Sequence, residues 1–85
     1  MDRPELLQSR EKTHGSFATN AEVSQGLKYK FRRQNHYEQM SDVHKEALDM
    51  IALKISRILS GQASFKDHWD DIAGYAHLGA EACIK

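Results

Sequence analysis

The chain has 85 residues and a formal net charge of zero, with 12 basic and 12 acidic side chains. A chain of this length is expected to form one domain over residues 1–85, and it buries only about 60% of its unfolded surface. Balanced charge gives no overall attraction to nucleic acid or to an anionic membrane, so we expect neither as a direct partner. The single cysteine, Cys83, excludes an intramolecular disulfide and suits a reducing cytoplasm. No signal peptide is recognisable, and no apolar run reaches the roughly 18 residues of a membrane helix.

Residues 1–18 are polar and mixed in character, which predicts an N-terminal arm that is partly ordered. Pro4 favours a short helix at the start of the arm, because proline is tolerated at a first helical position. Gly15 predicts a turn after it, since glycine allows a positive φ. The alternative interpretation is that the arm closes over a site, with Arg10 or His14 reaching a ligand.

A first main helix is expected over about residues 20–34. Thr19 and Glu22 have the spacing of a capping box. Apolar residues then recur at helical spacing on one face, at Val23, Leu27 and Phe31. Four cations follow in the same helix: Lys28, Lys30, Arg32 and Arg33. They either contact phosphate or form a solvated helix end that the helix dipole favours.

A second main helix is expected over about residues 41–60, with Ser41 as its N-cap and Gly61 ending it. Its wide apolar face consists of Leu48, Ile51, Ala52, Ile55, Ile58 and Leu59. A charged stripe runs along the opposite side, with Lys54 beside it. A helix of this kind is expected to be covered on more than one side, so its charges must be paired or satisfied, because unpaired burial costs several kcal/mol.

A third main helix is expected over about residues 65–84, with Ser64 and Asp67 giving a weaker capping signal. One face of this helix consists of Trp69, Ile72, Ala73, Ala76, Ala80 and Cys83, including the small residues Ala76 and Ala80. Together with the glycines of this segment, they allow another helix to approach closely. The sequence therefore predicts an all-α fold of three main helices and an arm, completed by homo-oligomerisation through the last two helices.

Acidic residues on the last two helices form the pattern with the most chemical content: Glu46, Asp49, Asp67, Asp70 and Asp71. Acids three or four apart share a helix face, and two packed helices bring such faces together. Three interpretations remain open. The acids hold Mg²⁺, or they form a salt-bridge network with Lys54 and Arg57, or these two cations hold a phosphorylated ligand. The five histidines do not have the spacing of a zinc motif, and the chain contains no phosphate-binding glycine loop.

Three segments of the chain resemble a family of small phage-encoded helical proteins of uncharacterised function. The first is Arg10 followed by His14-Gly15, and the second is Lys54 followed by Arg57. The third is the close of the chain, with Asp67, Asp71, Gly74 and Tyr75. The resemblance implies phage or prophage origin, an all-α fold and a location in the cytoplasm of the infected bacterial host.

A more distant resemblance is to the MazG-like all-α nucleotide pyrophosphohydrolases, which hold Mg²⁺ with an ExxE motif and an ExxD motif. Glu46-x-x-Asp49 and Asp67-x-x-Asp70 stand at comparable places. Aspartate replaces glutamate at positions 49 and 67, which shortens the reach of each side chain by one methylene. This resemblance implies Mg²⁺ as the cofactor of a hydrolase, with Glu46, Asp49, Asp67 and Asp71 as its ligands.

The function expected from these patterns is binding of a nucleotide-like phosphorylated molecule, as a small phage protein that sequesters a bacterial immune signal without a cofactor. The expected ligand-binding residues are Lys54, Arg57, Arg32, Arg33, His14, Trp69 and Tyr75. The arginines at 32 and 33 come from the same or a neighbouring protomer. The alternatives are the Mg²⁺-dependent pyrophosphohydrolase and a module that docks on a host enzyme through its small-residue face.

Overall fold

The computed structural model describes residues 5–83, and within them all regular structure is helical. There are four α-helices and one short 3₁₀ turn: α1 (Glu5–His14), α2 (Phe17–Arg32), η1 (Tyr37–Gln39), α3 (Asp42–Ser60) and α4 (Lys66–Glu81). The all-α prediction is confirmed. The three predicted main helices correspond to α2, α3 and α4, and the short helix expected at the start of the arm extends to His14 as α1. The sequence of α1 has no apolar period that would have indicated this length, and none of its residues is buried.

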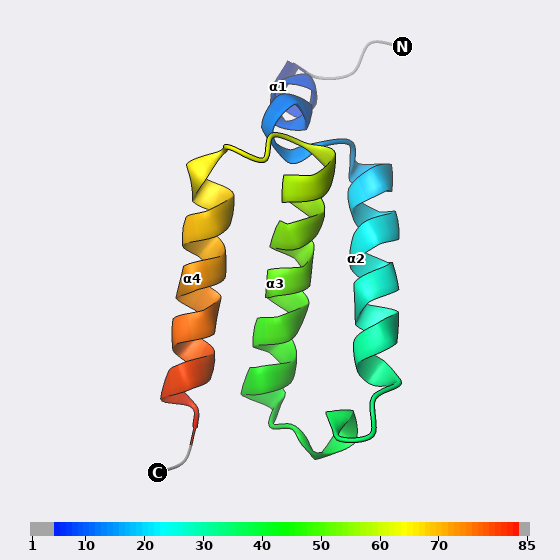
Figure 1. The fold of residues 1–85 in the computed structure, drawn as a ribbon. Helices are drawn as coiled ribbons and strands as arrows, with labels where there is room; N and C mark the ends of the chain where they lie inside the picture. The colour runs from blue at the N-terminus through cyan, green and yellow to red at the C-terminus, as the bar shows by residue number, and fades with distance from the viewer. Residues whose placement is uncertain (1–4, 84–85) are drawn as a thin grey trace.

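Helices α2, α3 and α4 lie side by side as a single layer, with α3 in the middle and α1 across one end (Figure 1). The molecule measures 51 × 25 × 18 Å, and its short dimension is less than two helix diameters. In a layer this thin, most apolar residues of α3 are only half-buried. Ala52 is accordingly the one fully buried apolar residue among residues 5–83.

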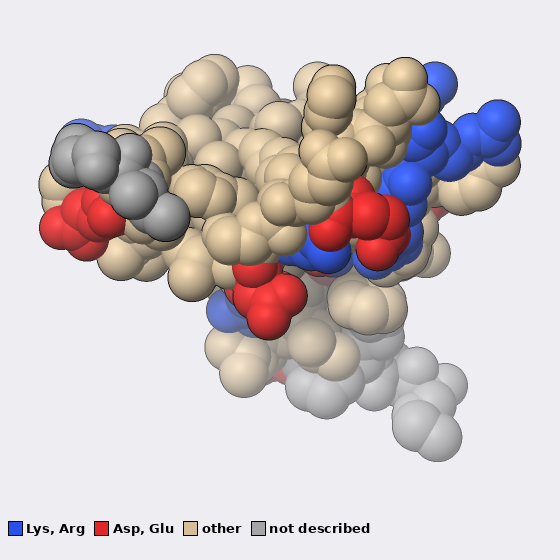
Figure 2. All heavy atoms as spheres, turned by 90° about the horizontal axis from the view of Figure 1, so that it is seen from below, with Lys and Arg blue, Asp and Glu red and all other residues tan. Residues whose placement is uncertain are grey.

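At the η1 end of the layer, the two broad sides differ in charge. Seen from the η1 end in Figure 2, charged side chains gather along the lower side and at the end of α2, and the upper side is uncharged across most of its width. The helix period puts half-buried apolar residues of α3, such as Leu48 and Ile55, on the uncharged side. None of the helices in residues 5–83 combines the length and hydropathy that a membrane span requires.

Serine caps begin α2 and α3. Ser41 Oγ accepts a hydrogen bond of 3.1 Å from the backbone N–H of His44, which confirms the predicted start of α3. Ser16 Oγ accepts one of 3.2 Å from Thr19 N–H, so α2 begins at Phe17 and not at the predicted capping box. Helix α4 begins at Lys66, within one residue of the predicted start, but its N-cap is Phe65 instead of the predicted Ser64 and makes no side-chain cap bond.

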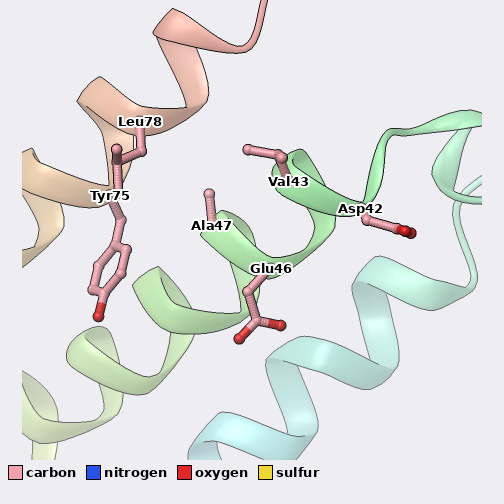
Figure 3. Close-up of a pocket in the computed structure, with 6 residues that line it drawn as sticks. All are labelled: Asp42, Val43, Glu46, Ala47, Tyr75 and Leu78. Carbon is pink, nitrogen blue, oxygen red and sulfur yellow. The ribbon is translucent and has the colours of Figure 1, made fainter.

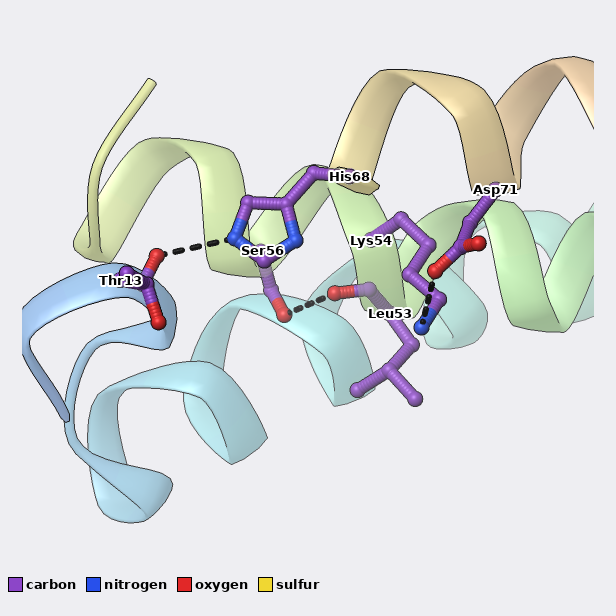
Figure 4. A network of polar contacts seen from close by, with 6 residues as sticks. All are labelled: Thr13, Leu53, Lys54, Ser56, His68 and Asp71. Carbon is purple, nitrogen blue, oxygen red and sulfur yellow. Dashed lines mark hydrogen bonds and ion pairs between the residues drawn. The ribbon is translucent and has the colours of Figure 1, made fainter. Parts of the chain in front are cut away.

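The end of α1 is fastened to the turn between α3 and α4. The Thr13 carbonyl accepts hydrogen bonds of 2.9 Å from Gln62 N–H and 2.9 Å from His68 Nε2–H (Figure 4). Gly15 has a φ of +78°, and a Cβ there would lie 2.5 Å from Ser60 Oγ. A Cβ on Gly61 would lie 2.4 Å from the Thr13 carbonyl oxygen. Both glycines are therefore required by the contact between the two turns, and this contact positions α1 beside α3.

Candidate functional site

The charged side of α3 carries a partly buried ion pair. Lys54 is 9% exposed, and its Nζ lies 3.0 Å from Asp71 Oδ2 on α4 (Figure 4). The Asp71 side chain remains 47% exposed. Among the described residues, this pair is the part of the predicted salt-bridge network that forms.

Arg57 lies one turn further along α3, where α1 crosses the layer. Together with Arg10 it lines a pocket of about 110 Å³, which we call the arginine pocket. The lining residues are Leu7, Arg10, Glu11, His14, Gly15, Phe17, Asn20 and Arg57. Burial lowers the pKa of Arg57, and the Arg10 guanidinium lowers it further, against a smaller opposing effect of Asp71 and Tyr75. Among the described residues, no carboxylate lies within ion-pair distance of Arg57. Two cations thus share one pocket.

His14 lines the same pocket from the end of α1. Its Nδ1 lies 2.5 Å from Thr13 Oγ1, and its ring packs edge-on against His68 at a centroid distance of 4.7 Å. Burial lowers the pKa of His14 below its ordinary 6.5, and the nearby Arg10 and Arg57 lower it further. The lowered pKa favours the neutral form of the imidazole.

Asn20 holds the wall of the pocket in place. Its Nδ2 donates a hydrogen bond of 2.7 Å to the His14 carbonyl, and its Oδ1 accepts one from the Ser60 hydroxyl. These bonds connect α2 to both turns that meet at this end of the molecule. They fix the distance between α2 and α3 next to Arg57.

Tyr75 extends from α4 toward α3 along a second, apolar groove of about 350 Å³ (Figure 3). Val43, Ala47 and Leu78 supply much of its wall, and the carboxylates of Asp42 and Glu46 point away from these apolar side chains. Tyr75 also lies close enough to Arg57 to affect its pKa. Of the predicted ligand-binding residues, the structure thus gathers His14, Lys54, Arg57 and Tyr75 on one side of the layer.

Arg32, Arg33 and Trp69 lie elsewhere. The Arg33 guanidinium stacks 5.1 Å from the Tyr29 ring centre and bonds its hydroxyl. Arg32, twelve residues after Asn20, lies about 18 Å further along α2 at 1.5 Å per residue. Trp69 is two residues before Asp71, about 200° around α4, and its Nε1–H donates to the Ala63 carbonyl over 2.7 Å. These three residues do not join the arginine pocket of their own chain.

The four predicted Mg²⁺ ligands Glu46, Asp49, Asp67 and Asp71 do not form a metal-binding cluster. Within residues 5–83, no three histidine, cysteine or acidic side chains come close enough to hold a metal ion together. Asp71 is held by Lys54, and Asp49 has one buried carboxylate oxygen without a hydrogen-bond partner. The donor set of a single chain therefore does not fit Mg²⁺, which requires several oxygen ligands in a near-octahedral arrangement.

Sequence reasoning did not identify Asn20, Ser24 or Phe17 as part of a site. Asn20 and Ser24 lie on the same face of α2 as Leu27 and Phe31, at the spacing of a buried stripe. Both are buried, at 7% and 3% exposure. Two polar residues on an otherwise apolar, inward-facing stripe were the available signal, because buried polar side chains require partners.

Comparison with known proteins identifies a family that has no assigned activity. No curated protein sequence and no solved structure matches the chain. A family model described as "Domain of unknown function (DUF6378)" matches residues 4–83, which include both turns, the arginine pocket and the Lys54–Asp71 pair. The chain belongs to the DUF6378 family.

Proposed function

We propose that this protein binds a nucleotide-type phosphorylated small molecule and holds its phosphate in the arginine pocket. One observation carries the proposal: Arg10 and Arg57 line one pocket, and Arg57 has no carboxylate partner among the described residues. Lys54, in contrast, forms an ion pair with Asp71 within the protein. A ligand phosphate would give Arg57 the ion-pair partner that no described carboxylate supplies.

A phosphate suits the pocket in charge, shape and size. Guanidinium groups bind phosphate oxygens through two parallel N–H bonds, and such charge-assisted bonds are about twice as strong as neutral ones. Burial is the main cause of the lowered pKa of Arg57 and of His14, and a bound phosphate would offset the second cause, the repulsion from neighbouring cations. The volume of about 110 Å³ is below the 300–1,000 Å³ typical of a pocket for a complete ligand. The arginine pocket therefore takes the phosphate, and the rest of the ligand lies outside it.

The biological role that we propose is sequestration of a nucleotide signal by a phage-encoded protein. The resemblance of the Arg10–His14–Gly15 and Lys54–Arg57 segments to small phage proteins supports this role. The same segments meet at the arginine pocket and its neighbouring ion pair. We propose further that two or more copies associate through the uncharged side of the layer. The helix period puts Leu59 on the same face of α3 as Leu48 and Ile55, and Leu59 is 69% exposed. Leu59→Asp is then expected to reduce the molar mass measured by sedimentation equilibrium to that of the monomer, and an unchanged mass would contradict this.

The hydrolase alternative has one observation in its favour. A buried, unpartnered carboxylate oxygen of Asp49 is available to a cation. This alternative predicts that a nucleoside triphosphate is consumed in the presence of Mg²⁺ and that Asp49→Asn abolishes turnover. An intact ligand recovered after incubation with Mg²⁺ would exclude it.

The test of the proposed function is a thermal-shift and calorimetric screen against nucleoside triphosphates and cyclic nucleotides, each with and without Mg²⁺. A ligand at 100 times its Kd stabilises the protein by about 2.7 kcal/mol, or roughly 10–20 °C for a domain of this size. We expect a shift without Mg²⁺, and recovery of the ligand intact.

Variants then locate the ligand. Arg57→Gln and Arg10→Gln are expected to weaken binding at least about tenfold, because a charged hydrogen bond contributes about 1.5–3 kcal/mol. Arg33→Gln is the matched control, since Arg33 stacks on Tyr29 outside the pocket, and it is expected to bind normally. Unchanged binding by Arg57→Gln in a folded protein would refute the proposal.

A further inference from the structure

A second hollow adjoins the arginine pocket, in the groove between α2 and α3. Its volume is about 150 Å³, and we call it the α2–α3 groove. The lining residues are Phe17, Asn20, Ala21, Ser24, Gln25, Lys28, Leu53 and Arg57. Phe17, Asn20 and Arg57 line both hollows, so a ligand that extends out of the arginine pocket past Arg57 enters this groove.

Ser24 gives the groove an unused hydrogen-bonding group. The residue is 3% exposed, and its hydroxyl has no hydrogen-bond partner. Serine inside a helix commonly satisfies its hydroxyl on a backbone carbonyl of the preceding turn, as Ser56 does with the Leu53 carbonyl at 2.6 Å. Ser24 is buried but lacks such a bond, which is unfavourable unless another molecule supplies the partner.

Phe17 gives the groove an aromatic surface. It is the first residue of α2 and is 82% exposed, which is unusual for a phenylalanine side chain. Because it lines both hollows, its ring lies where a ligand passes from one to the other. Leu53 on α3 supplies a second apolar surface within the groove. Flat heteroaromatic rings bind to such surfaces through stacking and apolar contact.

The other polar residues of the groove have separable roles. Asn20 is already bonded to the His14 carbonyl and to Ser60, so it is a positioning residue. Gln25 is exposed, and its amide both donates and accepts hydrogen bonds. Lys28 stands in the same wall, one turn of α2 after Ser24. The groove therefore combines an apolar surface with a buried hydroxyl, an amide and a cation.

We propose that the α2–α3 groove binds the base of a nucleotide whose phosphate lies between Arg10 and Arg57. The base lies against Phe17 and Leu53, and Ser24 and Gln25 form hydrogen bonds with its polar edge. This inference rests on the proposed function, and it adds the part of the site that distinguishes one nucleotide from another.

The test compares ligands that share phosphates but differ in the base. Dissociation constants for ATP, GTP, CTP, UTP and inorganic triphosphate are measured by titration calorimetry on the full chain. The wild-type protein is expected to bind at least one nucleoside triphosphate about tenfold or more tighter than inorganic triphosphate. It is also expected to discriminate among the four bases.

Two variants remove the contacts that we assign to the base. Ser24→Ala is expected to weaken the preferred nucleotide by about fivefold and to leave inorganic triphosphate unchanged, as suits the loss of one neutral hydrogen bond. Phe17→Leu is expected to weaken all four nucleotides and again to leave inorganic triphosphate unchanged. Ser56→Ala is the matched control, because it removes a buried serine hydroxyl of α3 that lines neither hollow, and its nucleotide binding is expected to be normal. Melting curves of each variant establish that it is folded.

The outcomes separate this inference from the proposed function. If nucleotides bind no tighter than inorganic triphosphate, or if Ser24→Ala and Phe17→Leu weaken both kinds of ligand equally, the groove does not bind a base. A phosphate site at Arg57 would then still stand. If neither nucleotides nor inorganic triphosphate bind to the folded wild-type protein, the proposed function fails and this inference fails with it.

Discussion

Replacing Asp71 with asparagine is expected to destabilise the protein far more than replacing its partner Lys54 with methionine. The two ends of the ion pair differ in exposure, since the Lys54 side chain is 11% exposed and the Asp71 side chain is 47% exposed. Asp71→Asn leaves a buried ammonium group without its charge partner. Lys54→Met leaves a carboxylate that water already reaches, and methionine fills the space of the lysine stem.

The magnitude follows from the same exposures. Removing one partner of a fully buried pair costs 3–5 kcal/mol, whereas a fully exposed pair contributes at most about 1 kcal/mol. For a pair with one buried and one half-exposed end, we expect Asp71→Asn to cost about 2 kcal/mol. Lys54→Met is expected to cost about 0.5 kcal/mol or less. At 4–8 °C per kcal/mol, Asp71→Asn then lowers Tm by about 8–16 °C.

The assay is urea denaturation of the ligand-free protein at pH 7, with all variants at one protein concentration so that self-association affects them equally. The double variant K54M/D71N completes the cycle, and its stability is expected to be close to that of Lys54→Met alone. If the two single variants lose the same free energy, or if Lys54→Met is the less stable one, the assignment of a buried ammonium held by Asp71 is wrong.

Three further predictions concern backbone, pH and buried hydroxyls. Gly26 lies in open space on α2, so Gly26→Ala is expected to raise the free energy of unfolding by about 0.5–1 kcal/mol. Gly15 has a φ of +78°, so Gly15→Ala is expected to lower the free energy of unfolding by at least about 2 kcal/mol. Urea denaturation measures both. The pKa of His14 is lowered in the folded state, so His14 binds a proton more readily in the unfolded chain. The free energy of unfolding is therefore expected to fall as the pH falls below 6.5, and to fall less in His14→Gln. In the absence of ligand, Ser24→Ala is expected to be neutral or stabilising by up to about 1 kcal/mol, because the Ser24 hydroxyl is unpaired. Ser56→Ala is expected to cost about 1 kcal/mol, because it loses a hydrogen bond. The opposite order in thermal melts would show that Ser24 is paired in solution.

The binding model adds a pH dependence that can be measured on the ligand. A phosphate between Arg10 and Arg57 raises the pKa of His14 from its lowered value, so binding takes up a proton. The affinity for inorganic triphosphate is therefore expected to rise as the pH falls from 7.5 to 6, and His14→Gln is expected to lose that component. Equal slopes for the two proteins would place His14 away from the phosphate.

The sequence by itself determined where helices form when they carry strong local signals. Ser41 supplies the cap of α3, and the apolar period of that helix is long enough to be unambiguous. It also determined that Lys54 needs a partner, because a cation surrounded by apolar residues on a packed helix cannot remain unpaired. The family match over residues 4–83 is likewise a property of the sequence.

Tertiary structure decided which of these residues meet. Helix α1 buries none of its residues, and its place is set by bonds from Gln62 and His68 to the Thr13 carbonyl, which leave no periodic trace in the sequence. Those bonds bring Arg10 to Arg57, two residues far apart in the chain. The acids predicted to share a metal ion are spaced correctly along their helices, yet in the described chain they do not converge.

The physical reason is that spacing along a helix fixes only the direction in which a side chain points relative to its own axis. Whether two faces meet depends on how far each helix is rotated and shifted against its neighbour, and the packing of a whole layer sets those quantities. A paired group such as Lys54 and an unpaired one such as Ser24 therefore look alike in sequence. Only the arrangement of α2, α3 and α4 separates a residue that the protein pairs, such as Lys54, from one whose buried hydroxyl has no partner, such as Ser24.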